Sequence, residues 1–107
     1  MPRKSRKTSS TLIWRGIHCR VSHQRDYISQ GWSHLEIESL HPSRAPLPIT
    51  DTGYRSHFCD EDDIVAAGGA VAFVERWLEA EAGSKRYAQA KVAFDQYDLF
   101  ACPRSDS

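Results

Sequence analysis

The residues best suited to chemistry in this sequence cluster between Asp51 and Asp60. Ser56, His57 and Cys59 supply a hydroxyl, an imidazole and a thiol, with a carboxylate at either end of the cluster. Such groups perform nucleophilic or acid–base catalysis once tertiary structure brings them into hydrogen-bond contact. Because adjacent residues of one segment seldom face each other, we keep a small hydrolase or metal-dependent enzyme, using His57 and nearby acidic residues, as the alternative interpretation.

Metal binding and cofactor binding find little support in the residue spacings. The chain has five histidines and three cysteines, namely His18, Cys19, His23, His34, His41, His57, Cys59 and Cys102. Structural zinc usually draws on close pairs such as Cys-x2-Cys, which the sequence lacks, and it contains no His-Glu-x-x-His, Walker loop or Gly-x-Ser-x-Gly elbow. The acidic run 60–63 lacks the calcium-loop spacing. We therefore expect no catalytic residues, no metal ligands and no cofactor.

The segment 47–58, LPITDTGYRSHF, is the most distinctive stretch of the chain. Its Asp-Thr-Gly sequence is a turn signal, because Gly53 can adopt a positive φ. Tyr54, Arg55 and His57 follow, and tyrosine and arginine are typical anchors at binding surfaces. We predict that these three side chains share one exposed patch; the alternative is a turn between strands whose aromatic rings pack inward.

Charge is segregated along the chain although the net charge is zero. Residues 1–25 hold seven basic and no acidic residues, whereas residues 60–81 hold seven acidic residues and one basic residue. Arg15 and Arg20, with Trp14 beside them, could extend a basic tail onto a folded surface, and aromatic residues among basic ones suit single-stranded nucleic acid. The pattern indicates either a nucleic-acid partner or a protein partner.

The elements that must position these residues are strands followed by helices. Alternating hydrophobicity predicts an antiparallel sheet of two to three strands at about 12–22, 32–40 and 47–58. Apolar spacings of three and four predict two helices at about 61–82 and 84–98, with Gly68-Gly69 as a flaw in the first. The chain is therefore predicted to be an α+β domain over 12–100 with both helices packed on one face of the sheet. Residues 1–11 would form a disordered basic tail, and 101–107 would fray.

The predicted core joins the first helix to the sheet. Leu78 is expected to be buried. Together with Val71 and Val74, it should face four sheet residues, Ile13, Ile17, Leu35 and Ile37. No apolar run approaches the length of a membrane helix, and no signal peptide is evident, so we expect a cytoplasmic protein with no membrane partner.

Residues from Leu35 to about Ile64, with the segment 47–58 at their centre, resemble a stretch of small uncharacterised proteins of bacterial plasmids and other mobile elements. The resemblance implies a bacterial, cytoplasmic accessory protein and transfers no catalytic or binding residue. We favour a small, non-enzymatic binding module that docks on a protein or on nucleic acid, such as a mobile-element accessory or defence-modulating protein. Its candidate binding residues are Tyr54, Arg55, His57, Arg15, Arg20 and Trp14.

Overall fold

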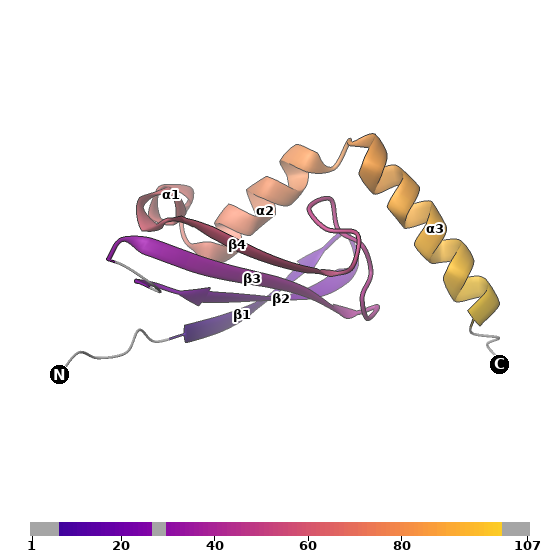
Figure 1. Ribbon diagram of the computed structural model, residues 1–107, viewed down its shortest axis with the longest axis horizontal. Coiled ribbons are helices and arrows are strands. Elements are labelled where there is room, and N and C mark those ends of the chain that lie inside the picture. The colour runs from indigo at the N-terminus through magenta and orange to yellow at the C-terminus, as the bar shows by residue number, and fades with distance from the viewer. Residues whose placement is uncertain (1–6, 27–29, 102–107) are drawn as a thin grey trace.

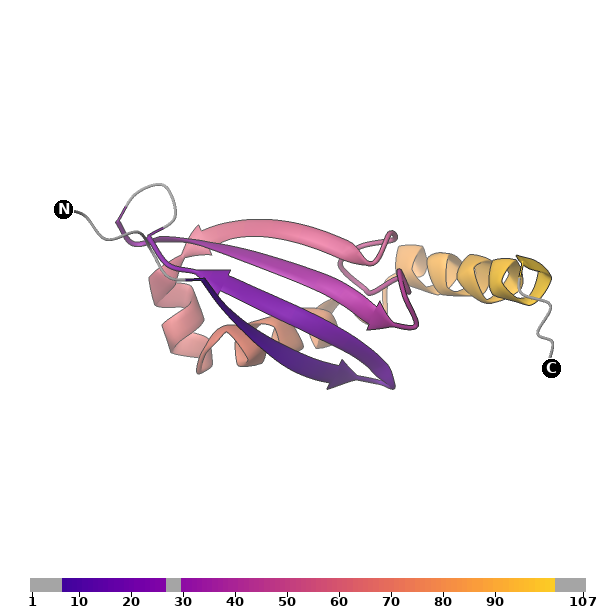
Figure 2. The ribbon, with the colours of Figure 1, turned by 90° about the horizontal axis from the view of Figure 1, so that it is seen from below.

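The strands of this chain precede its helices, a segregation that is typical of an α+β domain. The computed structural model describes residues 7–26 and 30–101, with side chains up to Gln96. In this part of the chain the elements are β1 (Lys7–Trp14), β2 (Ile17–Gln24), β3 (Trp32–His41), β4 (Tyr54–Asp60), α1 (Glu61–Ala67), α2 (Ala70–Glu81) and α3 (Lys85–Ala101). The sheet is antiparallel in the order β1-β2-β3-β4. Helices α1 and α2 lie against one face, and no described helix covers the other (Figures 1 and 2).

A tight hairpin replaces the single strand predicted over 12–22. Arg15 and Gly16 both adopt positive φ, 48° and 84°, as a two-residue type I′ turn requires. Trp14 then lies directly opposite Ile17, so both side chains point to the same face. This turn shifts the alternation by one residue and moves Ile13, expected in the core, to the uncovered face, where it is 61% exposed.

The strand β1 begins at Lys7, so residues 7–11 belong to the sheet and not to the tail to which the sequence assigned them. Residues 1–6 and 102–107, the other parts of the predicted tail and frayed end, lie outside the described residues.

The strand predicted at 47–58 is shorter than expected, because β4 starts only at Tyr54. The preceding residues form a compact loop with one isolated bridge between Leu47 and Thr50. Pro48 lies inside this loop and has no N–H to contribute to a ladder. A hydrogen bond of 2.7 Å from the Ser39 N–H to the Gly53 carbonyl ties the loop to β3.

The predicted helix 61–82 is two helices separated by Gly68-Gly69. Both glycines have positive φ, 103° and 119°, which helical residues do not adopt. The Gly68 and Gly69 N–H groups donate to the Val65 and Ile64 carbonyls and close the end of α1. The break lets α2 change direction and cross the sheet (Figure 1).

The core lies between α2 and the helix-covered face of the sheet. Leu78 and Val74 are completely buried, as predicted, against Leu35 and Ile37 of β3, which are also completely buried. The loop adds Leu47 to this core. Residues that alternate with these along β3 stay partly or fully accessible, which confirms the expected polar parity.

Helix α3 departs from the prediction that both helices pack on the sheet. It projects beyond the end of the sheet in both views (Figures 1 and 2). Tyr87, in its first turn, is buried and packs at 5.9 Å from the Trp14 ring, and Arg86 binds the loop at Asp51 and Pro48. None of the described helices is long and apolar enough to cross a membrane.

Candidate functional site

The face of the sheet that α1 and α2 leave uncovered, called here the open face, carries alternate residues of all four strands. One row across it runs through Thr11, Arg20, Glu38 and Tyr54, which are paired in register. Tyr54 and Phe58 stand on the outer strand β4 and are 47% and 40% exposed. The open face therefore presents large aromatic rings beside charged groups.

Glu36 lies at the centre of the open face and holds two neighbours in place. Its carboxylate accepts a hydrogen bond of 2.8 Å from the Tyr54 hydroxyl and pairs with the Lys7 ammonium at 2.7 Å. Hydrogen bonds from Lys7 and Tyr54 lower the pKa of Glu36, and the same contact with Glu36 raises the pKa of Tyr54. The carboxylate thus stays ionised and fixes the orientation of the tyrosine ring.

A second group on the open face joins β3 to β4. The His34 and Phe58 rings stack with centroids 4.4 Å apart and an interplanar angle of 19°. His34 Nε2 lies 2.6 Å from the Ser56 hydroxyl oxygen. Two stacked rings and Tyr54 nearby make a preordered aromatic surface, which lowers the entropy cost of binding a partner.

The described part of the basic block in the N-terminal quarter, residues 7–25, pairs with carboxylates within the fold. Each of its four described basic residues pairs with a carboxylate from a later part of the chain. The pairs are Lys7–Glu36, Arg15–Glu79, Arg20–Glu38 and Arg25–Glu61. Such exposed pairs contribute little stability, but they remove the excess positive charge that phosphate binding requires. The charge segregation in the sequence thus reflects, at these four residues, internal pairing.

Trp14 and Arg15 fasten the first hairpin to α2. Trp14 is 3% exposed, and its Nε1 donates a hydrogen bond of 2.7 Å to Glu79. The Arg15 guanidinium lies 4.8 Å from the Trp14 ring centroid and also binds Glu79, at 3.0 Å. These two hydrogen bonds lower the pKa of Glu79. Trp14, which was predicted to bind a partner, is therefore a residue of the core.

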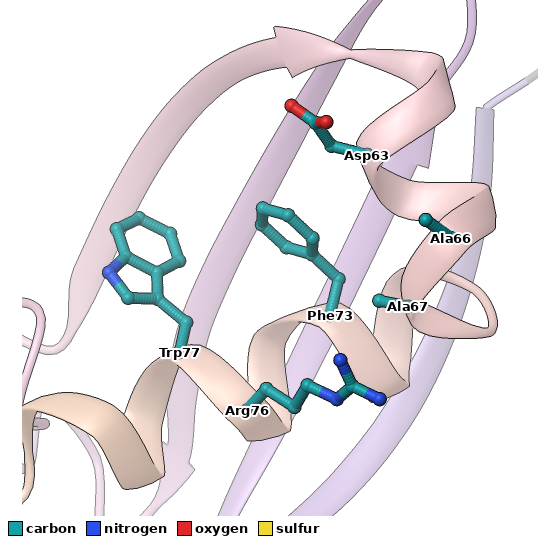
Figure 3. Close-up of a pocket in the computed structure, with 6 residues that line it drawn as sticks. All are labelled: Asp63, Ala66, Ala67, Phe73, Arg76 and Trp77. Atoms are coloured by element: carbon teal, nitrogen blue, oxygen red, sulfur yellow. The ribbon is translucent and has the colours of Figure 1, made fainter.

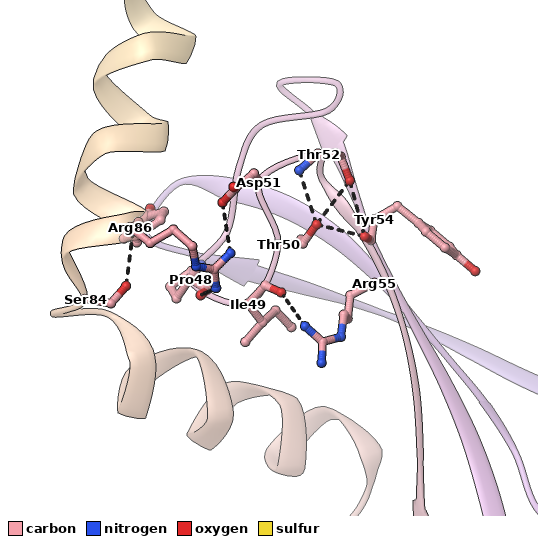
Figure 4. Close-up of polar contacts among 10 residues, drawn as sticks. Pro48, Ile49, Thr50, Asp51, Thr52, Tyr54, Arg55, Ser84 and Arg86 are labelled. Carbon is pink, nitrogen blue, oxygen red and sulfur yellow. Dashed lines mark hydrogen bonds and ion pairs between the residues drawn. The ribbon is translucent and has the colours of Figure 1, made fainter.

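The loop before β4 sets the direction of Tyr54 and Arg55 (Figure 4). The Thr50 hydroxyl donates to the Tyr54 carbonyl at 2.8 Å, and the Thr50 backbone exchanges hydrogen bonds with Leu47. The Arg55 guanidinium donates to the Ile49 carbonyl at 2.9 Å. These contacts hold the backbone at the start of β4 in one position.

Arg55 and His57 point to the helix-covered side of the sheet. The Arg55 guanidinium lies 5.2 Å from the Trp77 ring centroid, and the His57 ring lies 4.4 Å from the same ring and 6.1 Å from Phe73. Burial, and the positive charge of Arg55, lower the pKa of His57. In the described part of the chain the His57 ring stacks against aromatic rings and forms no hydrogen bond with a hydroxyl, thiol or carboxylate.

The structure therefore separates the patch predicted from the sequence. Tyr54 lies on the open face, whereas Arg55 and His57 lie on the other face, because successive residues of a strand point to opposite sides. Arg20 joins Tyr54 on the open face through Glu38. Three residues of this face were not predicted to bind a partner, namely Phe58, Glu36 and His34. The period-two alternation of β3 and β4 places them on the same face as Tyr54.

The thiols of Cys19 and Cys59 are buried and unpaired. Burial raises the pKa of Cys19 to about 11 and also raises that of Cys59, where nearby carboxylates add to the effect. Among residues 7–26 and 30–101, no group of three His, Cys, Asp or Glu side chains is placed to hold a metal ion.

A family model described as the KlcB third domain matches residues 7–87, which span the whole sheet, α1, α2 and the first turn of α3. No curated protein and no solved structure matches.

Proposed function

Because the chain belongs to the KlcB third-domain family, whose description presents this unit as one domain among several, we propose that it is a non-enzymatic docking module. Its partner is a protein, and the docking surface is the open face of the sheet. We expect the module to act in the bacterial cytoplasm as a mobile-element accessory, a role that the resemblance of segment 47–58 supports.

The observation that carries this proposal is the exposure of apolar side chains on the open face. Five of them project from strands β1, β3 and β4, namely Ile13, Trp32, Leu40, Tyr54 and Phe58. Apolar residues scattered singly are ordinary on a protein surface, whereas several on one face of a sheet indicate an interaction surface. Aromatic residues are also the side chains most enriched among binding hot spots.

The pairing of charges on the open face favours a protein over nucleic acid. Arg20 and Lys7 bind Glu38 and Glu36 directly, so a phosphate backbone approaching this surface would meet carboxylates as well as cations. Balanced charge around an aromatic centre is typical of protein–protein interfaces, whereas protein surfaces that bind nucleic acid carry a net positive charge.

Affinity capture with variant baits tests this proposal. Wild-type protein, a Tyr54→Ser/Phe58→Ser variant and a Val65→Ser/Val92→Ser control are incubated with lysate of the source cell, and the bound proteins are quantified by mass spectrometry. The control removes two apolar side chains that are 63% and 55% exposed on α1 and α3.

The expected result is a captured protein that the control retains and the open-face variant loses by at least tenfold, since two hot-spot residues each contribute 1 kcal/mol or more. Equal capture by both variants would contradict the docking surface. Capture of nucleic acid, released steeply by salt, would contradict the choice of a protein partner.

A further inference from the structure

A recess lies between α1 and α2, on the opposite side of the sheet from the open face (Figure 3). It has a volume of about 380 Å³. Its aromatic walls are Phe73 and Trp77 of α2, the small residues Ala66 and Ala67 of α1 close one end, and Asp63 and Arg76 stand at the rim. We call this recess the α1–α2 cleft.

The aromatic walls of the cleft are preordered. Phe73 and Trp77 each precede a fully buried residue of α2, Val74 and Leu78, so they lie about 100° round the helix from the core and face β4. Their ring centroids are 6.2 Å apart, and His57 of β4 packs against both rings from below. A partner can therefore stack on these rings without reordering them.

The charged lining of the cleft is one carboxylate, Asp63, and one guanidinium, Arg76, and the Arg55 guanidinium lies 5.2 Å from the Trp77 ring centroid; the carboxylates of Asp60 and Asp62 neighbour Asp63 in the chain. Asp60, Asp62 and Asp63 form no ion pair among the described residues, whereas their neighbour Glu61 is held by His23, Ser33 and Arg25. In Figure 3 the Asp63 carboxylate points over the space between β4 and Phe73, while the Arg76 guanidinium extends away from it, toward Ala67. An aromatic wall beside a carboxylate is the arrangement that attracts an organic cation.

Strand β4, whose His57 packs against the aromatic walls of the cleft, is one of the two outer strands of the sheet. Hydrogen bonds at the two ends of its pairing with β3 join Glu61 to Gly31 and Ser39 to Gly53. In the antiparallel pattern these bonds turn the backbone groups of Arg55 and His57 inward, toward β3, and those of Ser56 outward, to the free edge. An added strand along this edge would place alternate side chains over the cleft.

We propose that the α1–α2 cleft binds an extended peptide segment that adds to the edge of β4 and places an arginine or lysine side chain between the rings of Phe73 and Trp77 and the carboxylate of Asp63. The geometry combines a backbone template, an apolar wall and an opposite charge, which together select for an extended, basic sequence. The cleft lies on the side of the sheet opposite the open face, but an added strand would place its intervening side chains beside Tyr54 and Phe58, so the Asp63 variant is the arm that tests the cleft alone.

The probe is the blocked peptide acetyl-Thr-Val-Arg-Val-Thr-amide, titrated into the ¹⁵N-labelled full chain and followed by NMR. We expect shifts at the Trp77 indole N–H and at the Ser56 and His57 amides, and none at the indole of Trp32 on the open face. A peptide with glutamine in place of arginine should bind several-fold more weakly. A peptide methylated at its central amide nitrogen should also bind more weakly, because it cannot pair with the strand edge.

Two matched variants test whether the Asp63 carboxylate supplies the charge that binds the arginine side chain. Asp63→Asn should weaken binding of the arginine peptide roughly three- to tenfold, as loss of an exposed charged contact does, whereas Asp62→Asn, next to it on α1 but outside the cleft lining, should leave the affinity within twofold. Both positions are exposed, so both variants should keep the wild-type spectrum. Equal binding of the glutamine peptide, or unchanged affinity in Asp63→Asn, would overturn the proposal. Preferred binding of a glutamate peptide that is lost in Arg76→Gln would also overturn it.

Discussion

Gly53 holds the loop that aims Tyr54 and Arg55, and replacing it by alanine is the sharpest test of this part of the structure. Its φ is +83°, and a Cβ added there would lie 2.6 Å from the Cα and 2.7 Å from the carbonyl carbon of Arg44. These are backbone atoms, so the loop itself would have to move. Gly16 offers a matched control, since its φ is +84° and nothing lies within 4 Å of the added Cβ.

The expected magnitudes differ because only one site has a steric clash. At Gly16 the left-handed conformation costs an alanine about 1–2 kcal/mol, partly offset by about 0.4–1 kcal/mol from the stiffer unfolded chain. The expected loss of unfolding free energy is therefore about 0.5–1.5 kcal/mol. Forced displacement of backbone at Gly53 adds about 1–3 kcal/mol, as overpacking does, so Gly53→Ala should lose about 2–4 kcal/mol.

Urea unfolding of Gly53→Ala, Gly16→Ala and wild type, followed by circular dichroism, measures these differences. NMR shifts at the Thr50 and Tyr54 amides should report displacement of the loop only in Gly53→Ala, because Thr50 binds the Tyr54 carbonyl. Equal losses in the two variants, within about 0.5 kcal/mol, would refute the close approach of the loop to Gly53.

Three further predictions concern the core, pH dependence and the thiols. Leu78→Ala should lose about 2–5 kcal/mol of unfolding free energy, whereas Val65→Ala, at a position 63% exposed, should change it by less than about 0.5 kcal/mol; similar losses would contradict the packing of α2. Burial lowers the pKa of His57 in the folded state, so the unfolded chain binds more protons and stability falls as the pH drops below about 6.5; His57→Gln should lose less stability between pH 7 and pH 5 than wild type. In a Cys102→Ser variant, folded protein at pH 8 should react with Ellman's reagent far more slowly than unfolded protein, because burial raises the pKa of Cys19 to about 11.

Local signals in the sequence located most of the elements. The alternation of Leu35 and Ile37 with polar residues predicted β3 and its buried face, because a half-buried strand has a period of two. The spacing of Val74 and Leu78 predicted the buried side of α2. Gly68-Gly69 was noted as a flaw in one predicted helix over 61–82, and the structure ends α1 and starts α2 there, because glycine adopts the required φ without strain.

The first hairpin was missed because its turn lacks the usual sequence signal. Asn-Gly or Asp-Gly normally marks a type I′ turn, and here Arg15 takes the first position with a φ of 48°. The binding of Arg15 to Glu79 and its stacking on Trp14 accompany this uncommon conformation. Glu79 belongs to α2 and lies 64 positions after Arg15, so this contact cannot be inferred from residues near the turn in sequence.

The candidate binding surfaces also depend partly on local sequence and partly on tertiary packing. The alternation along β4, which can be read from the sequence, puts Tyr54 and His57 on opposite faces, although the two residues were predicted to share one patch. The tertiary structure decides which of the two faces stays exposed, because α2 crosses one side of the sheet and leaves the other uncovered (Figure 2). The same packing brings Glu79 to a residue 64 positions earlier in the chain and places Trp77 over His57. Contacts of this range depend on how whole elements pack, and no local spacing encodes them.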